Sequence, residues 1–204
     1  MKIKLTKGEL KKQRDALKQY QRYLPTLQLK KQQLQLEILR QHNLLDERKR
    51  ILAGKIKSAV SWAGLIIEDR DSLRKFIFPE SVAAGQKNIA GVDIPVFENA
   101  VFKTEEYDLF LAPLWLDSGI EALRAIVSLQ EETKVIEKGV EILKHELRIT
   151  TQRVNLFEKV KIPEAEEAIR LIKIYIGDQM ANAVGRSKIA KAKIEENVLA
   201  GVAA

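Results

Sequence analysis

The sequence contains no cysteine, and only two of its 204 residues are histidine. Without cysteine the chain has no disulfide, no thiolate nucleophile and no cysteine-based zinc site, which agrees with a reducing compartment such as the cytoplasm. His42 and His145 each lie in a charged helical stretch without a matching ligand set, which favours ordinary surface or seam positions over metal binding or acid–base catalysis. We therefore expect no metal and no cofactor.

Long apolar runs and phosphate-binding loops are also missing. The longest relevant uncharged run, residues 58–67, is far shorter than the roughly 20 residues that span a bilayer. No apolar core follows the basic residues 1–12, so we expect no secretory signal. Gly54-Lys55 lacks the upstream glycine of a Walker loop. The sequence therefore predicts a chain that is not an enzyme and reaches a membrane only through other proteins.

Basic residues are concentrated at the N-terminal end. The formal net charge is +7, and residues 1–60 hold 16 Lys and Arg against 5 Asp and Glu, whereas the remainder is slightly acidic. This asymmetry indicates an acidic partner or a polyanion at that end. Because aromatic residues do not alternate with the lysines as in a single-strand platform, a solvated helix face or an acidic protein socket is the simpler interpretation. The candidate contact residues are Lys11, Lys12, Arg14, Lys18 and Arg22.

The first long segment has apolar residues at seven-residue spacing. One row contains Leu10, Leu17, Leu24, Ile38, Leu45, Leu52, Ala59, Ile66 and Leu73. A second row contains Tyr20, Leu27, Leu34, Trp62 and Phe76, with Gln41, Arg48 and Lys55 in its middle. Two such rows indicate a coiled-coil helix with a polar centre. Thr6 and Glu9 form a capping box at its start, and Pro79 limits its continuation.

A second long segment repeats this pattern, beginning at a capping box of Ser118 and Glu121. Its rows contain Ala122, Leu129, Ile136, Leu143 and Phe157, and Ile126, Val140, Leu147 and Val154. Beyond Pro163 the stripe resumes at Ile169, Ile172, Ile176 and Met180. We expect residues 7–78 and 116–198 to pair antiparallel, with Leu17 near Ala190 and Ile66 near Ile126. Pro25 and Pro163 predict kinks or short breaks, because proline removes a helical hydrogen bond.

The middle segment, residues 79–117, differs from both flanks. Alternating apolar residues on either side of a turn in residues 88–97 predict a small β-hairpin. Its candidate contact residues are Ile89, Gly91, Val92, Ile94 and Pro95. Two interpretations stay open: a contact surface for neighbouring subunits, or a self-contained small core.

The sequence therefore predicts a mainly α fold. A long antiparallel two-helix coiled coil is formed by the N- and C-terminal segments, with a small central domain containing a β-hairpin. The expected domains are residues 1–78, the N-terminal coiled-coil helix; 79–117, the central insert; and 118–204, the C-terminal coiled-coil helix.

Three stretches carry a resemblance that covers nearly the whole chain. They are Thr6–Leu10; Asn88–Glu98, with its glycine and proline; and Thr151–Glu158 followed by Ile162-Pro163 and Glu166–Arg170. In this order they resemble the D-subunit family of vacuolar/archaeal-type rotary ATPases. The chain departs from the family pattern at Pro25 and at Leu156-Phe157.

This resemblance implies the function of a central-stalk rotor shaft, which couples ATP synthesis or hydrolysis to translocation of H⁺ or Na⁺. The implied partners are catalytic head subunits of the A and B types around the paired terminal helices, the small F-subunit of the central stalk, and a foot subunit that links to the membrane ring. The implied location is cytoplasmic, peripheral to the membrane through the complex. The alternative is a basic helical hairpin that binds nucleic acid or serves as a scaffold; for a shaft no nucleic-acid binding is expected.

Overall fold

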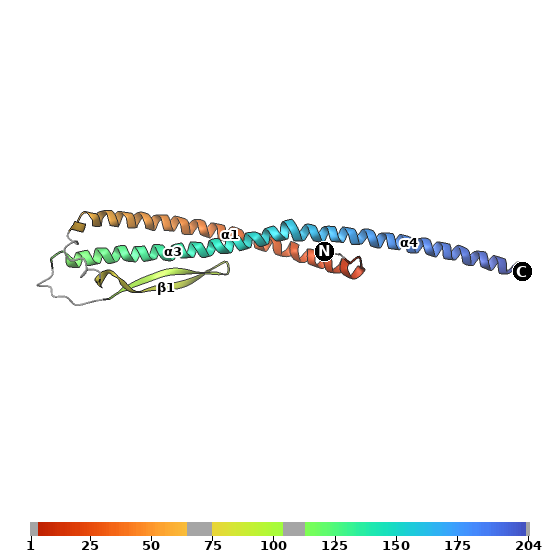
Figure 1. Cartoon of the computed structure of the whole chain (residues 1–204), viewed down its shortest axis with the longest axis horizontal. Helices are drawn as coiled ribbons and strands as arrows, with labels where there is room; N and C mark the ends of the chain where they lie inside the picture. The colour runs from red at the N-terminus through yellow and green to blue at the C-terminus, as the bar shows by residue number, and fades with distance from the viewer. Residues whose placement is uncertain (1–3, 65–74, 104–112, 203–204) are drawn as a thin grey trace. The chain divides into compact units, whose positions relative to one another are not determined.

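A computed structural model describes residues 4–64, 75–103 and 113–202. Its elements are α1 (Lys7–Val60), β1 (Pro79–Ile89), β2 (Val92–Phe102), α3 (Leu116–Leu156), the π-helical turn η2 (Phe157–Lys161) and α4 (Ile162–Val202), as Figure 1 shows. The mainly α fold, with helices from both terminal segments and a two-stranded hairpin between them, is confirmed.

The chain forms two compact units. Unit 1 comprises Met1–Gln28 and Gln152–Ala204, and unit 2 comprises Leu29–Thr151. Each unit contains part of α1 and part of the C-terminal helical segment, and the hairpin belongs to unit 2. The three domains expected from the sequence were divided by changes in residue pattern along the chain, whereas these units are divided by contacts. The three-domain division therefore stays a prediction.

The predicted heptad rows form the seam of unit 2. Leu34 and Leu45 of α1 are buried, as are Ile136, Val140 and Leu143 of α3. Their spacing of three and four residues brings them to one side of each helix, where apolar side chains leave water. Positions that sequence analysis left blank in the α3 rows are filled by Thr133 and Thr150, which are also buried. Thr133 satisfies its hydroxyl by donating to the Gln130 carbonyl at 2.7 Å.

The helix boundaries agree with the sequence at one cap and differ at two ends. Thr6 caps α1, since its hydroxyl accepts a hydrogen bond from the Glu9 amide at 3.3 Å. Ser118 does not cap α3, because the helix already begins at Leu116, whose side chain is buried in the core. The end of α1 is Val60 rather than a residue near Pro79. There the Ser61 hydroxyl donates to the Ser58 carbonyl at 2.7 Å, a local bond that competes with helix continuation.

The hairpin is longer than the sequence indicated. β1 and β2 are antiparallel strands of 11 residues each, and Ile89 pairs with Val92 across a two-residue turn. Both turn residues, Ala90 and Gly91, have positive φ angles of 52° and 77°. This is the signature of a type I′ turn, whose twist matches that of the strands. Pro79 stands at the first position of β1, where its missing amide costs little.

The antiparallel pairing is confirmed, but one predicted contact is wrong. In unit 1, Gln13 and Tyr20, which flank Leu17 in α1, line a groove with residues 161–168. Leu17 is therefore level with this stretch and not with Ala190. Residues 5–7 lie beside residues 175–186. The expected contact of Ile66 with Ile126 falls outside the described residues, as does Leu73 of the first heptad row.

The predicted irregularity at Pro163 is present as η2, which ends two residues before the proline. At Pro25 the helix α1 continues without a break in its assignment.

Candidate interaction surfaces

The basic surface of α1 consists of the five predicted residues Lys11, Lys12, Arg14, Lys18 and Arg22, all of which are exposed. Within the described part of the chain, none of the five forms an ion pair. Their charge is therefore available to a partner. Whether these residues contact another subunit stays a prediction.

Other basic residues of α1 are neutralised inside unit 2. Lys30 pairs with Glu146 at 2.9 Å, and Lys49 pairs with Glu137 at 2.7 Å. Arg48, part of the predicted polar centre, forms an ion pair with Glu132, with Nε 3.0 Å from the carboxylate. The geometry of this pair is not that of a hydrogen bond. In all three pairs the cation is on α1 and the anion on α3. Part of the basic charge of α1 is thus neutralised within the chain, and the part that is not includes the five residues at its N-terminal end.

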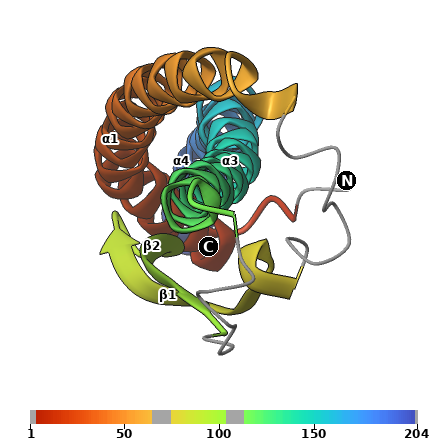
Figure 2. The same ribbon diagram turned by 90° about the vertical axis from the view of Figure 1, so that its left-hand side faces the viewer.

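The hairpin tip is fixed to both helices of unit 2. Ile94 of β2 is only 2% exposed and packs with Leu34 of α1 and Leu143 of α3. Seen end-on in Figure 2, α1 and the hairpin flank α3. At Gly139 of α3, an added Cβ would lie 3.8 Å from Ile94 Cβ and from the Pro95 carbonyl oxygen. The small residue therefore lets β2 approach the helix closely.

Of the five hairpin residues singled out from the sequence, Ile94 thus belongs to a core shared with two helices. Ile89 and Val92 are half-buried against the same cluster, Pro95 is half-buried, and Gly91 is exposed at the turn. The segment is therefore not a self-contained core. The surface that it offers to a partner is made by the residues around Ile94, and its role as a contact stays a prediction.

The base of the hairpin is held by a residue that sequence analysis missed. Arg124 of α3 donates from Nε to the Phe76 carbonyl and from a terminal nitrogen to the Lys103 carbonyl, both at 2.9 Å. Its guanidinium also lies 5.4 Å from the centre of the Phe102 ring. These carbonyls precede β1 and follow β2, so one side chain joins both ends of the hairpin to α3. The only signal in the sequence was a lone arginine within an apolar stretch.

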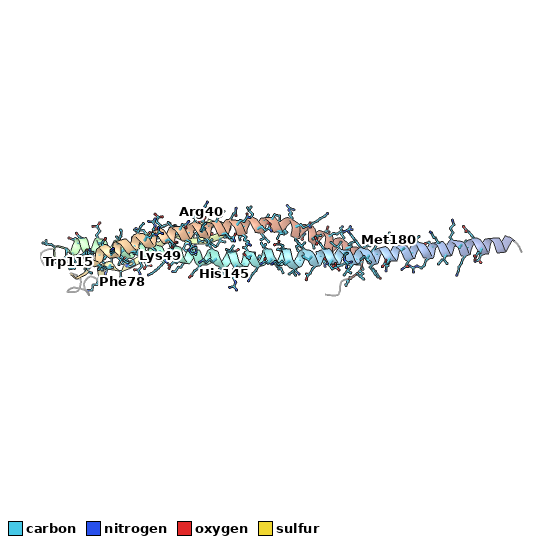
Figure 3. All side chains as sticks on the ribbon, turned by 90° about the horizontal axis from the view of Figure 1, so that it is seen from above. Arg40, Lys49, Phe78, Trp115, His145 and Met180 are labelled. Atoms are coloured by element: carbon cyan, nitrogen blue, oxygen red, sulfur yellow. The ribbon has the colours of Figure 1, made fainter. Side chains whose placement is uncertain are left out.

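The C-terminal part of α4 is exposed along its length. Every residue from Gly177 to Asn197 is exposed, and the side chain of Met180 can be located in Figure 3. Met180, Val184, Ile189 and Ile194 are each more than half exposed. This stretch is therefore an exposed helix that carries apolar side chains.

The described residues hold no cluster of three or more His, Asp or Glu side chains placed to bind a metal ion. His42 is half-buried and His145 is exposed on α3, where Figure 3 labels it. In the part of the chain that the structure describes, the clear pKa shifts are at the exposed pair Glu167 and Arg170 of α4, where the hydrogen bond from Arg170 lowers the pKa of the Glu167 carboxyl. Among the described helices, none is both long and apolar enough to cross a bilayer.

Comparison with known proteins shows the family of this chain. The family model for the ATP synthase D-subunit matches residues 9–192. The V-type ATP synthase D-subunit of Borreliella burgdorferi is 46% identical over 194 residues, which cover 95% of each chain. The chain belongs to the ATP synthase D-subunit family. The corresponding protein of Chlamydia pneumoniae is 33% identical over 95% of this chain and 93% of its own. That of Chlamydia caviae is 32% identical over 95% and 94%.

Membership of the D-subunit family confirms the resemblance that rested on three short stretches. It also favours the expected function, a central-stalk component of a V-type rotary ATPase, over a nucleic-acid-binding or scaffold hairpin. In the structure, residues 151–158 form the end of α3 and the start of η2, and Ile162-Pro163 begins α4. The stretch 88–98 contains the type I′ turn and the buried Ile94.

Proposed function

We propose that this chain is the rotor shaft of its complex and does no chemistry of its own. The observation that carries the proposal is the pairing of α1 with the C-terminal helical segment in both units. In unit 2 the pairing is made by an apolar seam and cross-helix ion pairs, and in unit 1 by the contact between the Tyr20 and Phe157 rings. Two helices packed side by side resist bending and twisting better than either alone. Transmission of torque between a catalytic head and a membrane sector requires such an element.

The absence of a catalytic role is supported by the side chains available. The sequence has no cysteine, two histidines and no phosphate-binding glycine loop. We expect the purified chain to release no phosphate from ATP above background. Hydrolysis that persists through further purification and is lost on substitution of one residue of this chain would contradict the proposal.

The partners follow from the distribution of exposed groups. We infer that the paired terminal helices, residues 1–78 and 118–204, turn inside a head of A-type and B-type subunits. The unpaired cations Lys11, Lys12, Arg14, Lys18 and Arg22 would face acidic surfaces there. We assign the central segment, residues 79–117, to contacts with the foot of the stalk and with its small F-subunit. In this segment Ile89, Gly91, Val92 and Pro95 form the surface, and Ile94 supports it from the core.

Coupling arises from the difference between the two helices. α1 carries an excess of basic residues and α3 supplies the acidic partners, so the shaft presents unlike sides to the subunits around it. Each orientation then makes different contacts with each surrounding subunit. A conformational equilibrium shifts by the difference in binding free energy between its states. Rotation can thus favour a different nucleotide state in each site, with the complex at the cytoplasmic face of the membrane.

The test reverses charges on the proposed contact surface. A chain with Lys11→Glu and Lys18→Glu, both exposed on α1, is compared with a control that carries Lys138→Glu and Lys144→Glu, both exposed on α3. Exposed charge pairs contribute about 0.2–1 kcal/mol each, and reversal adds repulsion. We therefore expect roughly tenfold weaker association with the isolated head for the α1 variant.

The control should lose much less association, because Lys138 and Lys144 lie outside the basic surface although they are on the same pair of helices. The difference between the two variants should shrink at high salt because ions screen exposed charges. Equal association of the two variants at low salt would remove the basic surface from the proposal. Binding of the native chain to nucleic acid with a steep salt dependence, in place of the head, would support the alternative function.

A further inference from the structure

The apolar seam of unit 2 specifies the register of its two helices only weakly. Leu45 of α1 packs with Ile136 and Val140 of α3. Because the apolar pattern repeats every seven residues, a slip of that length brings equivalent positions together again. In one direction Leu45 would lie opposite Leu143 and Leu147. The apolar side chains by themselves therefore distinguish poorly between the native and the slipped register.

The ion pairs between the helices carry the missing information. Three pairs join α1 to α3 in unit 2: Lys30 with Glu146 at 2.9 Å, Arg48 with Glu132 at 3.0 Å, and Lys49 with Glu137 at 2.7 Å. They are spread over roughly 28 Å of helix. Exposed ion pairs contribute little one by one, but a slip of one helix along the other affects all three together.

A seven-residue slip toward the leucines brings like charges together. Lys30 would then lie opposite Arg153 of α3. Lys49 would lie opposite Lys144, and Arg48 would face a glycine. Two attractive pairs thus become repulsive ones, and the half-buried Arg48 is left without its acid. Charge therefore opposes the slip that the apolar pattern tolerates.

A slip in the opposite direction also removes every pair. The three cations would lie opposite uncharged residues of α3, which are Gly139, Ala125 and Gln130. The apolar contact weakens as well, because Leu45 would face Thr133 in place of Val140. Of these three registers, the native one alone places the three α1 cations against acids.

We propose that the three ion pairs form a register lock, which stops α1 from sliding along α3 and thereby preserves the seat of the hairpin tip. Ile94 packs with Leu34 and Leu143 together, so both leucines must be level with the tip. A seven-residue slip displaces one of them by roughly 10 Å along the helix axis, and the seat is lost. The lock is a property of unit 2 that does not depend on the proposed function, although a shaft under load gains from it.

The test reverses two of the cations. In the reversed variant, Lys30→Glu with Lys49→Glu, the native register places each new carboxylate against an acid of α3. The slipped register instead places them opposite Arg153 and Lys144. We therefore expect this variant to adopt the slipped register.

Two further variants serve as comparisons. The swapped variant adds Glu146→Lys and Glu137→Lys to the reversed variant, which restores opposite charges in the native register together with the hairpin seat. The control variant, Arg50→Glu with Lys57→Glu, changes the net charge as much as the reversed variant does. Both of its positions are exposed on α1, and neither forms an ion pair within the described part of the chain. Both comparison variants should keep the native register.

The register is measured by double electron–electron resonance on the full chain at low salt. Because the chain has no cysteine, spin labels can be placed at Gln33→Cys on α1 and Gln130→Cys on α3. The reference pair, Gln130→Cys with Arg148→Cys, lies on α3 alone, and all three sites are exposed. In the reversed variant we expect the labels on α1 and α3 to move apart by roughly 10 Å along the axis. The reference distance should be the same in every variant.

A native distance between α1 and α3 in the reversed variant would overturn the register lock. If that variant loses its cooperative melt, the swapped variant decides the question: recovery of both the melt and the native distance supports the lock, and no recovery refutes it. Failure of the proposed function is a separate result, since the native chain, in its native register, would then not associate with the head subunits.

Discussion

Truncation of Ile94 measures how firmly the hairpin tip is built into unit 2. The side chain is 2% exposed and packs between Leu34 and Leu143, so Ile94→Ala removes apolar contacts with two helices at once. Burial of an isoleucine is worth about 1.5–3 kcal/mol, and a residual cavity brings typical Ile→Ala losses to roughly 2–5 kcal/mol. We expect a loss near the middle of this range, about 3 kcal/mol, because the tip belongs to a two-stranded hairpin that can relax in part.

The measurement is thermal and urea unfolding of the full chain, followed by circular dichroism. For a chain of this length, 1 kcal/mol corresponds to roughly 2–4 °C in Tm, so the expected decrease is about 6–12 °C. The matched control is Val96→Ala, two residues further along β2, where the side chain is 40% exposed; we expect it to cost less than about 1 kcal/mol. Equal losses for Ile94→Ala and Val96→Ala would show that the tip is not part of the core and would refute the reasoning.

Two further predictions concern the anchoring of the hairpin to α3. Arg124→Lys removes the fork that bridges the Phe76 and Lys103 carbonyls, so we expect a loss of about 1–3 kcal/mol and faster amide hydrogen exchange at the ends of β1 and β2 than at the turn. Exchange that rises evenly along both strands would argue against this role. Gly139→Ala should raise the melting temperature, because its Cβ meets ordinary contacts at 3.8 Å and helix propensity favours alanine by about 1 kcal/mol. Gly139→Leu should lower it, because the longer side chain displaces β2; stabilisation by both substitutions would contradict the close approach.

The sequence alone determined which residues face the seam and where the hairpin turns. Apolar side chains at three- and four-residue spacing can leave water together only on one side of a helix, and this identified Leu34, Leu45 and Val140 in advance. The turn at Ala90-Gly91 lies within the stretch where apolar alternation predicted it. Both are local properties, set by the period of the chain and by backbone stereochemistry. They required no knowledge of distant contacts.

Pairing between distant residues was decided by the tertiary structure. A heptad seam is almost unchanged when one helix slides by seven residues, so the pattern could not distinguish Ala190 from residues 161–168 as the level of Leu17. Specific contacts such as Lys30 with Glu146 select one register. The same holds for Arg124 and Gly139, whose roles depend on a hairpin that reaches them from far away in sequence. Periodicity fixes which face of a helix is buried, and only three-dimensional packing fixes what that face meets.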